Sequence, residues 1–171
     1  MIHQQKYVKE LLKLFGMESA KPMATPISPS TRLVMDDGSS SVNEKSYRGM
    51  IGSLLYLTTS RPDIVFSVGF RARFQSNPKE THLKAAKWIF RYLKHASDLA
   101  LWYLRGCNFD LIGYAEADYA GFLVDRKSTS GMATFLGPCL VSWSTKKQHS
   151  VAMSTTEDEY VAAASCCAQL L

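Results

Sequence analysis

The chain has 171 residues, enough for one domain or two small ones, and a chain of this length can bury a core without metal or disulfide staples. Hydrophobic residues make up 46% of it and charged residues 20%, which excludes wholesale disorder, a collagen-like repeat and a disulfide-dense mini-protein. The 20 lysines and arginines exceed the 15 acidic residues, so the net charge of +5 permits an anionic partner such as nucleic acid without requiring one.

Neither a membrane span nor a secretory signal is expected. No segment reaches about 18 uncharged apolar residues, and the polar start Met1–Lys6 is not followed by an apolar stretch. The four cysteines form no C-x-x-C pair, so we expect reduced thiols in a reducing compartment. They are Cys107, Cys139, Cys166 and Cys167. The histidines lie too far along the chain from these cysteines for the spacing of a zinc site.

The N-terminal segment contains one amphipathic helix and a long linker. Apolar residues at helical spacing predict the helix over residues 6–17, with Gly16 as its C-terminal stop. Residues 18–42 hold three prolines and a run of serines without periodicity. This composition indicates a linker or an extended crossing segment.

Residues 43–96 have the pattern of three successive helices. Asn43 is placed to cap the first helix, while Pro62 and Pro78 mark the starts of the second and third, where a missing N–H costs little. The third helix has an apolar face at steps of three and four. This face consists of Leu83, Ala86, Ile89, Phe90 and Leu93.

Positive charge concentrates in residues 42–108, where 11 basic and 4 acidic residues give a net charge of +7, against −2 for the remainder. Four of the basic residues form one stripe along the third helix: Lys84, Lys87, Arg91 and Lys94. Such a stripe is typical either of a solvated helix face or of a surface that contacts phosphates. The aromatic residues interleaved with it, Trp88, Phe90 and Tyr92, are more typical of a core than of a platform for stacking bases.

The pattern changes to short strands near residue 99. The strand candidates are residues 99–103, 109–121, 131–136, 140–143 and 150–153. Short strands in sequential order predict an antiparallel meander. Four basic residues fall at the predicted turns, either solvated or in contact with phosphates: Arg126, Lys127, Lys146 and Lys147. A final helix begins at Ser154, which with Glu157 has the spacing of a capping box, and residues 161–171 suit a buried helix.

Carboxylates on two predicted elements suit a metal site. Glu116 and Asp118 share one face of their strand because side chains alternate along a strand. Glu157, Asp158 and Glu159 lie in the first turns of the final helix. A strand carboxylate beside a helix carboxylate is a way to hold magnesium, and phosphodiester hydrolysis uses two such ions about 4 Å apart. The alternative is that these helix residues only favour the cap and the helix dipole.

Several long strings carry a family resemblance. They are SYRGMIGSLLYL at 46–57, SRPDI at 60–64, GYAEADYAG at 113–121, DRKSTSG at 125–131, VSWSTKKQ at 141–148 and STTEDEYVA at 154–162. These strings resemble, in the same order, the copia-type retrotransposon Pol polyprotein. The resemblance covers essentially the whole chain and is specific, because both the strings and their order match.

The resemblance implies an α+β fold. Residues 1–42 would be the end of the reverse transcriptase with a linker, and residues 43–106 a helical region similar to the thumb and connection. Residues 107–171 would be the N-terminal part of a truncated RNase H-like domain, an antiparallel three-strand meander plus a helix. That domain cuts RNA in RNA–DNA hybrids, so the implied partners are such a hybrid or other nucleic acid and the remaining Pol polypeptide, without a membrane.

The resemblance assigns catalytic roles to Glu116, Glu159 and Asp118, with Glu116 and Glu159 as ligands of Mg²⁺. Glu116 stands where the family has aspartate, and the added methylene moves the carboxylate by roughly 1 Å, which can cost ~10²-fold in a positioned site. The family's later RNase H aspartates would follow Leu171, and the polymerase motif Tyr-Val-Asp-Asp would precede this chain. We therefore expect no polymerase activity and negligible nuclease activity from the chain alone.

The same resemblance makes the stripe on the third helix and the four basic turn residues candidates for contact with nucleic acid. A different class of function is a non-catalytic remnant that binds nucleic acid through its basic helical block, and a salt-dependent affinity would support it. A third interpretation is a chain that does not fold stably. The family implies an intracellular location, in a cytoplasmic particle or the nucleus.

Overall fold

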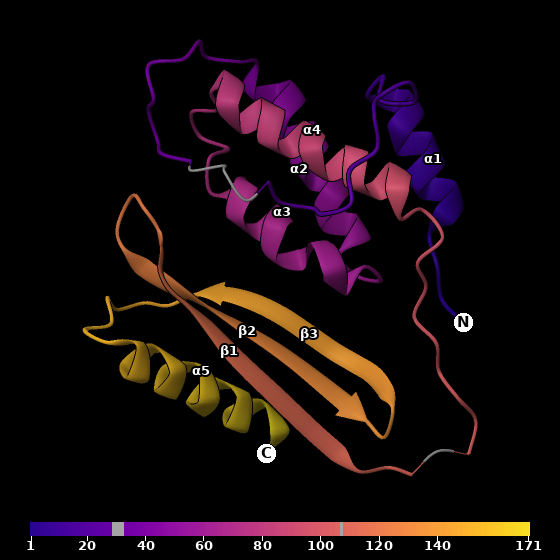
Figure 1. The fold of residues 1–171 in the computed structure, drawn as a ribbon, viewed down its shortest axis with the longest axis vertical. Coiled ribbons are helices and arrows are strands. Elements are labelled where there is room, and N and C mark those ends of the chain that lie inside the picture. The colour runs from indigo at the N-terminus through magenta and orange to yellow at the C-terminus, as the bar shows by residue number, and fades with distance from the viewer. Residues whose placement is uncertain (29–32, 107) are drawn as a thin grey trace. The chain divides into compact units, whose positions relative to one another are not determined.

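The computed structural model describes residues 1–28, 33–106 and 108–171; Pro29 of the predicted linker and the predicted thiol Cys107 lie outside the described residues. The described chain contains five α-helices, a 3₁₀ turn and one three-stranded antiparallel sheet (Figure 1). It divides into two compact units, Met1–Leu101 and Trp102–Leu171. The fold is therefore α+β, with the helices α1 to α4 in the first unit and the sheet with α5 in the second.

The first unit contains the predicted helices. They are α1 (Gln5–Leu14), α2 (Glu44–Leu57), the turn η1 (Pro62–Ile64), α3 (Val65–Ala72) and α4 (Glu80–His95). The predicted roles of Gly16 and Asn43 are confirmed, whereas Pro78 lies outside α4, one residue before its N-cap Lys79. Gly16 follows α1 with a φ of 63°, a left-handed conformation that glycine adopts without a Cβ penalty. The side-chain oxygen of Asn43 accepts a hydrogen bond from the backbone N–H of Ser46 at 2.9 Å and so caps α2.

The larger hydrophobic cluster of this unit draws on all of its helices. All four helices contribute fully or nearly fully buried side chains, among them Leu11, Leu54, Val68 and Ile89. Phe90 and Tyr92 belong to the same core, as the sequence predicted. A buried hydrogen bond from the hydroxyl of Tyr47 to the backbone carbonyl of Arg71, at 2.9 Å, ties α2 to α3.

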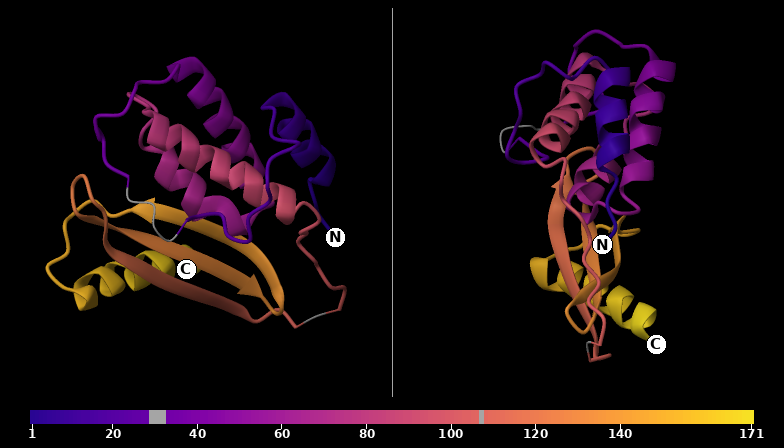
Figure 2. Two further views of the ribbon diagram at one scale, coloured as in Figure 1. Left: turned by 45° about the horizontal axis from the view of Figure 1, so that its top comes forward. Right: turned by 90° about the vertical axis from the view of Figure 1, so that its right-hand side faces the viewer.

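The second unit is an antiparallel meander with one helix. Strand β1 (Leu111–Phe122) pairs with β2 (Lys127–Leu136), which pairs with β3 (Cys139–Lys147). Helix α5 (Thr155–Leu170) packs across β1 and β2 on one face of the sheet (Figure 2). The predicted meander is confirmed, although β2 begins four residues before the predicted Gly131.

Two predicted strands are wrong. In residues 99–103 only Leu101 pairs, in a single bridge in which its N–H and carbonyl bond to Ile2 at 2.9 and 2.8 Å. Residues 150–153 form no strand either. Both stretches have the composition of strands, but a strand exists only where a neighbouring strand satisfies its backbone groups over several residues.

The prediction of a buried C-terminal helix is also wrong. Along α5 only Asp158, Ala162 and Cys166 are buried. These residues are four apart and form one stripe, which is the side of the helix that faces the sheet. The other alanines, Cys167 and Leu170 of α5 are exposed or only partly covered by the described residues, because a single sheet face covers only one side of a helix.

Candidate functional site

The carboxylates of β1 lie on the face of the sheet that points away from α5. Gly113 faces the helix, because a Cβ built there would lie 2.6 Å from Leu170 and 2.8 Å from Cys166. The pairing of β1 with β2 runs without a shift from Leu111 to Asp118, so side chains alternate regularly between them. Glu116 and Asp118 therefore project from the opposite face, where both are exposed.

The pairing of β1 with β2 becomes irregular directly after Asp118. The register of β1 shifts between Asp118 and Phe122, and within this stretch Ala120 has a φ of 49°, in the left-handed region. The N–H of Ala120 donates to the Ser128 hydroxyl at 3.0 Å. The Asp118 carboxylate lies where a Cβ on residue 121 would stand, so any residue larger than Gly121 would collide with it.

The three acidic residues at the start of α5 have three different environments. The Ser154 hydroxyl accepts the N–H of Glu157 at 3.2 Å, and the Glu157 carboxylate accepts the N–H of Met153 at 2.7 Å. Glu157 is thus a capping residue, as the alternative interpretation held. Asp158 is buried against the sheet, and Glu159 is exposed to solvent.

The residues described here do not assemble a two-ion magnesium site. Within residues 1–28, 33–106 and 108–171, no three His, Cys, Asp or Glu side chains gather closely enough to hold a metal ion. Glu116 points away from the helix that carries Glu159. Because the two predicted ligands project from different surfaces of the unit, the arrangement does not fit the metal that the resemblance implies.

Half of the basic stripe on α4 is engaged within the first unit. Residues 18–25, here called the strap, run along this helix. The Lys94 ammonium donates to the carbonyls of Glu18 and Ala20 at 2.7 and 2.9 Å. The Nε of Arg91 donates to the carbonyl of Lys21 at 2.7 Å. These two cations therefore anchor the strap, which is the extended crossing segment that the linker interpretation allowed.

Trp88 belongs to the same contact. Its indole N–H donates to the carbonyl of Thr25 at 2.8 Å, and its ring lies 5.2 Å from the guanidinium of Arg91. Trp88 is thus half-buried beneath the strap and not a free stacking platform. Lys84 is exposed and Lys87 half-buried, and neither forms a hydrogen bond or ion pair with a described residue. These two residues remain available for a phosphate.

Of the four basic turn residues, two are bonded to Asp125 and two are exposed to solvent. The Lys147 ammonium binds Asp125 at 2.7 Å and lies over the ring of Phe122. The N–H of Lys127 donates to the same carboxylate at 3.2 Å. Desolvation alone would raise the pKa of Asp125, but the bonds from Lys147 and the Lys127 N–H outweigh it and hold that pKa below its usual value. Arg126 and Lys146 are exposed.

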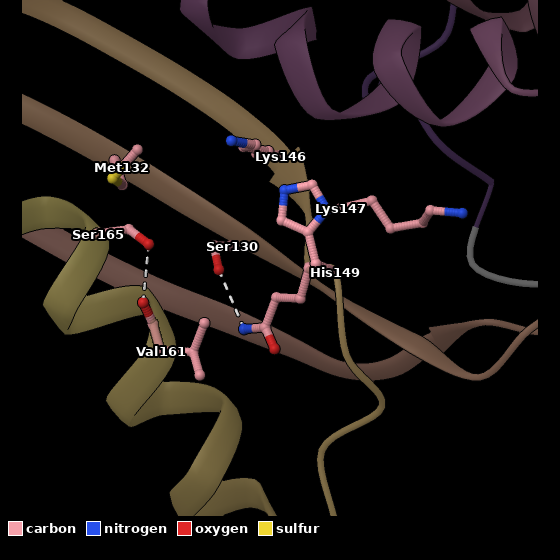
Figure 3. Close-up of a pocket in the computed structure, with 8 residues that line it drawn as sticks. Ser130, Met132, Lys146, Lys147, His149, Val161 and Ser165 are labelled. Atoms are coloured by element: carbon pink, nitrogen blue, oxygen red, sulfur yellow. Dashed lines mark hydrogen bonds between the residues drawn. The ribbon is translucent and has the colours of Figure 1, made fainter.

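A small pocket of about 80 Å³ opens between α5 and the end of the sheet (Figure 3). Its lining residues are Ser130, Met132, Lys146, Lys147, Gln148, His149, Val161 and Ser165. In Figure 3 the Lys147 side chain points away from the other lining residues, consistent with its bond to Asp125. Sequence analysis missed Gln148, which is almost fully buried, because a single glutamine after a strand carries no pattern of its own.

Comparison with known proteins finds polyproteins of mobile elements. The chain is 40% identical over 159 residues to the retrovirus-related Pol polyprotein from transposon RE1 of Arabidopsis thaliana, covering 93% of this chain and 11% of that protein. It is 40% identical over 170 residues to the corresponding polyprotein from transposon TNT 1-94 of Nicotiana tabacum, covering 95% and 13%. A shorter relative is the secreted RxLR effector protein 161 of Plasmopara viticola, 42% identical over 117 residues, 68% of this chain and 82% of that protein.

The chain belongs to the family of copia-type retrotransposon Pol polyproteins. It spans only 11% to 13% of the length of the two Pol relatives described. No family model and no solved structure matches it. Among the described residues, none of the helices has the length and apolar composition needed to cross a lipid bilayer.

Proposed function

We propose that Met1–Leu101 derives from the end of a reverse transcriptase and that Trp102–Leu171 is the first part of an RNase H-like domain. The identity to Pol polyproteins over more than nine-tenths of the chain supports this assignment. The meander followed by a helix agrees with the arrangement that the resemblance implies for the start of that domain. The ancestral substrate would be RNA in an RNA–DNA hybrid.

By itself, the chain binds nucleic acid without cutting it. The observation that carries this proposal is the orientation of Glu116, which projects from the sheet face opposite α5, while Glu159 lies on α5. Metal-assisted hydrolysis of a phosphodiester requires carboxylates that converge on the same ions. Two carboxylates on different surfaces do not meet this requirement.

Binding is attributed to the first unit, whose 15 basic and 8 acidic residues give a net charge of +7. The second unit carries 5 basic and 7 acidic residues, a net charge of −2. Lys84 and Lys87 are the residues of the α4 stripe that are left to contact phosphates. An interface of this kind weakens steeply as salt rises, because binding releases counterions from the nucleic acid.

The test is cleavage of a labelled RNA–DNA hybrid by the purified chain, with magnesium, with EDTA, and with Glu159→Gln as a control. We expect no product above the EDTA background. Magnesium-dependent cutting that disappears in Glu159→Gln would contradict the proposal. A further arm adds a polypeptide with the Pol region that follows this one in the relatives, and cutting only in that mixture would identify the remaining Pol polypeptide as the partner.

Affinity for the same hybrid, measured at two salt concentrations, tests the binding half of the proposal. Replacing both Lys84 and Lys87 by alanine should weaken binding and reduce the salt slope by about 1 to 2, since each phosphate contact contributes close to one. Arg126→Ala with Lys146→Ala removes the same charge from the other unit, and an equal loss of affinity there would place the phosphate contact at the basic turn residues instead. If the chain does not bind the hybrid even at low salt, the proposal that the first unit binds nucleic acid is wrong.

A further inference from the structure

The strap is bound to α4 through its main chain. The Lys94 ammonium, the Arg91 guanidinium and the Trp88 indole N–H donate to carbonyls of the strap at 2.7 to 2.9 Å. In the opposite direction, the N–H of Met23 donates to the carbonyl of Arg91 at 3.2 Å. All of these bonds use the main chain of the strap and none uses its side chains.

The strap buries little apolar surface of its own. Met17, just before it, is 7% exposed and belongs to the hydrophobic cluster of the first unit. Along the strap only Ala20 and Met23 are half-buried, and the other side chains are exposed. A segment with few buried apolar contacts and solvent-accessible hydrogen bonds opens far more readily than a core helix. The strap can therefore leave α4 without unpacking the buried core residues.

Release of the strap would uncover one continuous basic surface. Lys84, Lys87, Arg91 and Lys94 share a face of α4, and the step from the first to the last corresponds to about 15 Å of helix axis. Within the described part of the chain, none of these four cations forms an ion pair with a carboxylate. Trp88 lies on the same face, with its ring 5.2 Å from the guanidinium of Arg91.

The carbonyls of the strap compensate these cations only in part. A carbonyl oxygen carries a partial negative charge, whereas a phosphate carries a full one and therefore attracts lysine and arginine more strongly. Basic side chains without carboxylate partners thus favour an anionic chain over the strap. The indole ring beneath the strap adds a flat surface on which an unpaired base can stack. A single-stranded nucleic acid supplies both phosphates and unpaired bases.

We propose that the strap covers a binding surface for single-stranded nucleic acid and that the bound strand displaces it. Phosphates replace the carbonyls at Arg91 and Lys94, and a base stacks on Trp88. Because the strand binds the open form, its apparent affinity is the intrinsic affinity multiplied by the open fraction, so the strap weakens binding. This inference rests on the proposed function, since it extends the nucleic-acid surface of the first unit from the free lysines of α4 to its covered side chains.

The test follows hydrogen exchange of the Met23 N–H in the full chain, with and without saturating single-stranded oligothymidylate at low salt. This N–H is protected by the carbonyl of Arg91 only while the strap is in place. We expect the oligonucleotide to accelerate its exchange at least about tenfold, although ligand binding ordinarily slows exchange. The amide of Ile89 in the core of α4 should show no acceleration, which separates release of the strap from unfolding of the unit.

Met23→Pro gives an independent measurement. It removes the N–H that bonds to Arg91 and leaves every basic side chain of α4 in place, so the open fraction and the affinity for the oligonucleotide should rise about fivefold. Affinity for the fully paired hybrid should rise less, because paired bases cannot stack on Trp88. Ala24→Ser changes an exposed side chain of the strap without removing one of its bonds to α4, and should leave both affinities unchanged.

Three results would overturn this inference and leave the proposed function standing. They are binding of the oligonucleotide with unchanged or slower exchange at Met23, equal affinity of Met23→Pro and the native chain, and a chain that binds the hybrid but not the single strand. If Met23→Pro does not fold, exchange in the native chain still decides. If neither nucleic acid binds at low salt, the proposed function fails together with this inference.

Discussion

Loss of Arg91 and Lys94 should release the strap from α4. Together these side chains donate three hydrogen bonds to backbone carbonyls of residues 18–21, at 2.7 to 2.9 Å. Bonds to charged groups contribute about 1.5–3 kcal/mol when buried, and partial exposure reduces this to about 1 kcal/mol each. The double alanine variant should therefore lose about 2–3 kcal/mol of local stability, which raises the open population of the strap about 30- to 150-fold.

The backbone N–H of Met23 reports this opening, because it donates to the carbonyl of Arg91 at 3.2 Å and both variants keep that carbonyl. Its hydrogen-exchange rate should rise by the same factor in the double variant. Lys84→Ala with Lys87→Ala removes the same charge from the same helix without touching the strap, so its Met23 exchange should stay unchanged. The reasoning would be refuted if Met23 exchange stayed unchanged in the Arg91 and Lys94 variant while its affinity for the hybrid fell as in the control. Arg91 and Lys94 would then contact nucleic acid and not hold the strap.

Two further perturbations test the packing of each unit. Gly121→Ala places a Cβ against the Asp118 carboxylate and should cost about 1–3 kcal/mol of unfolding free energy by urea titration, whereas Asp118→Ala in the same chain should restore most of it. His82 is fully buried with its Nδ1 accepting the N–H of Lys79 at 2.9 Å, and burial lowers its pKa from 6.5. Because the folded state resists protonation, stability of the first unit should be complete above pH 6.5 and fall as pH drops below it; His82→Gln should remove that dependence.

Local signals made the helices predictable. Asn43 and Ser154 precede their helices with a side-chain oxygen ready to accept an N–H, and Pro62 begins η1 where no donor is needed. These bonds form between residues three apart, so the sequence contains both partners. The strand predicted at Leu99–Tyr103 does not form, because a strand also needs a pairing partner beside it, and the local sequence does not reveal whether one is present.

The candidate site was less predictable for the same reason. In the sequence, a lysine on a helix gives the same pattern whether its side chain is solvated or bound to other residues. Lys94 binds backbone carbonyls that are more than 70 residues away along the chain. Period-two alternation correctly put Glu116 and Asp118 on one face, but it does not say which face α5 covers. That was decided by Gly113, the residue with room for the helix.

Two neighbouring cysteines of α5, one on the stripe that faces the sheet and one outside it, give the molecule a pair of chemical reporters. Cys166 is 6% exposed, with its thiol against the carbonyl of Tyr114, while its neighbour Cys167 faces solvent. Thiols react with alkylating reagents only when the reagent reaches them. Cys167 should therefore be labelled at a constant rate, and Cys166 only in molecules whose helix has lifted. The ratio of the two adducts counts those molecules without any engineered label.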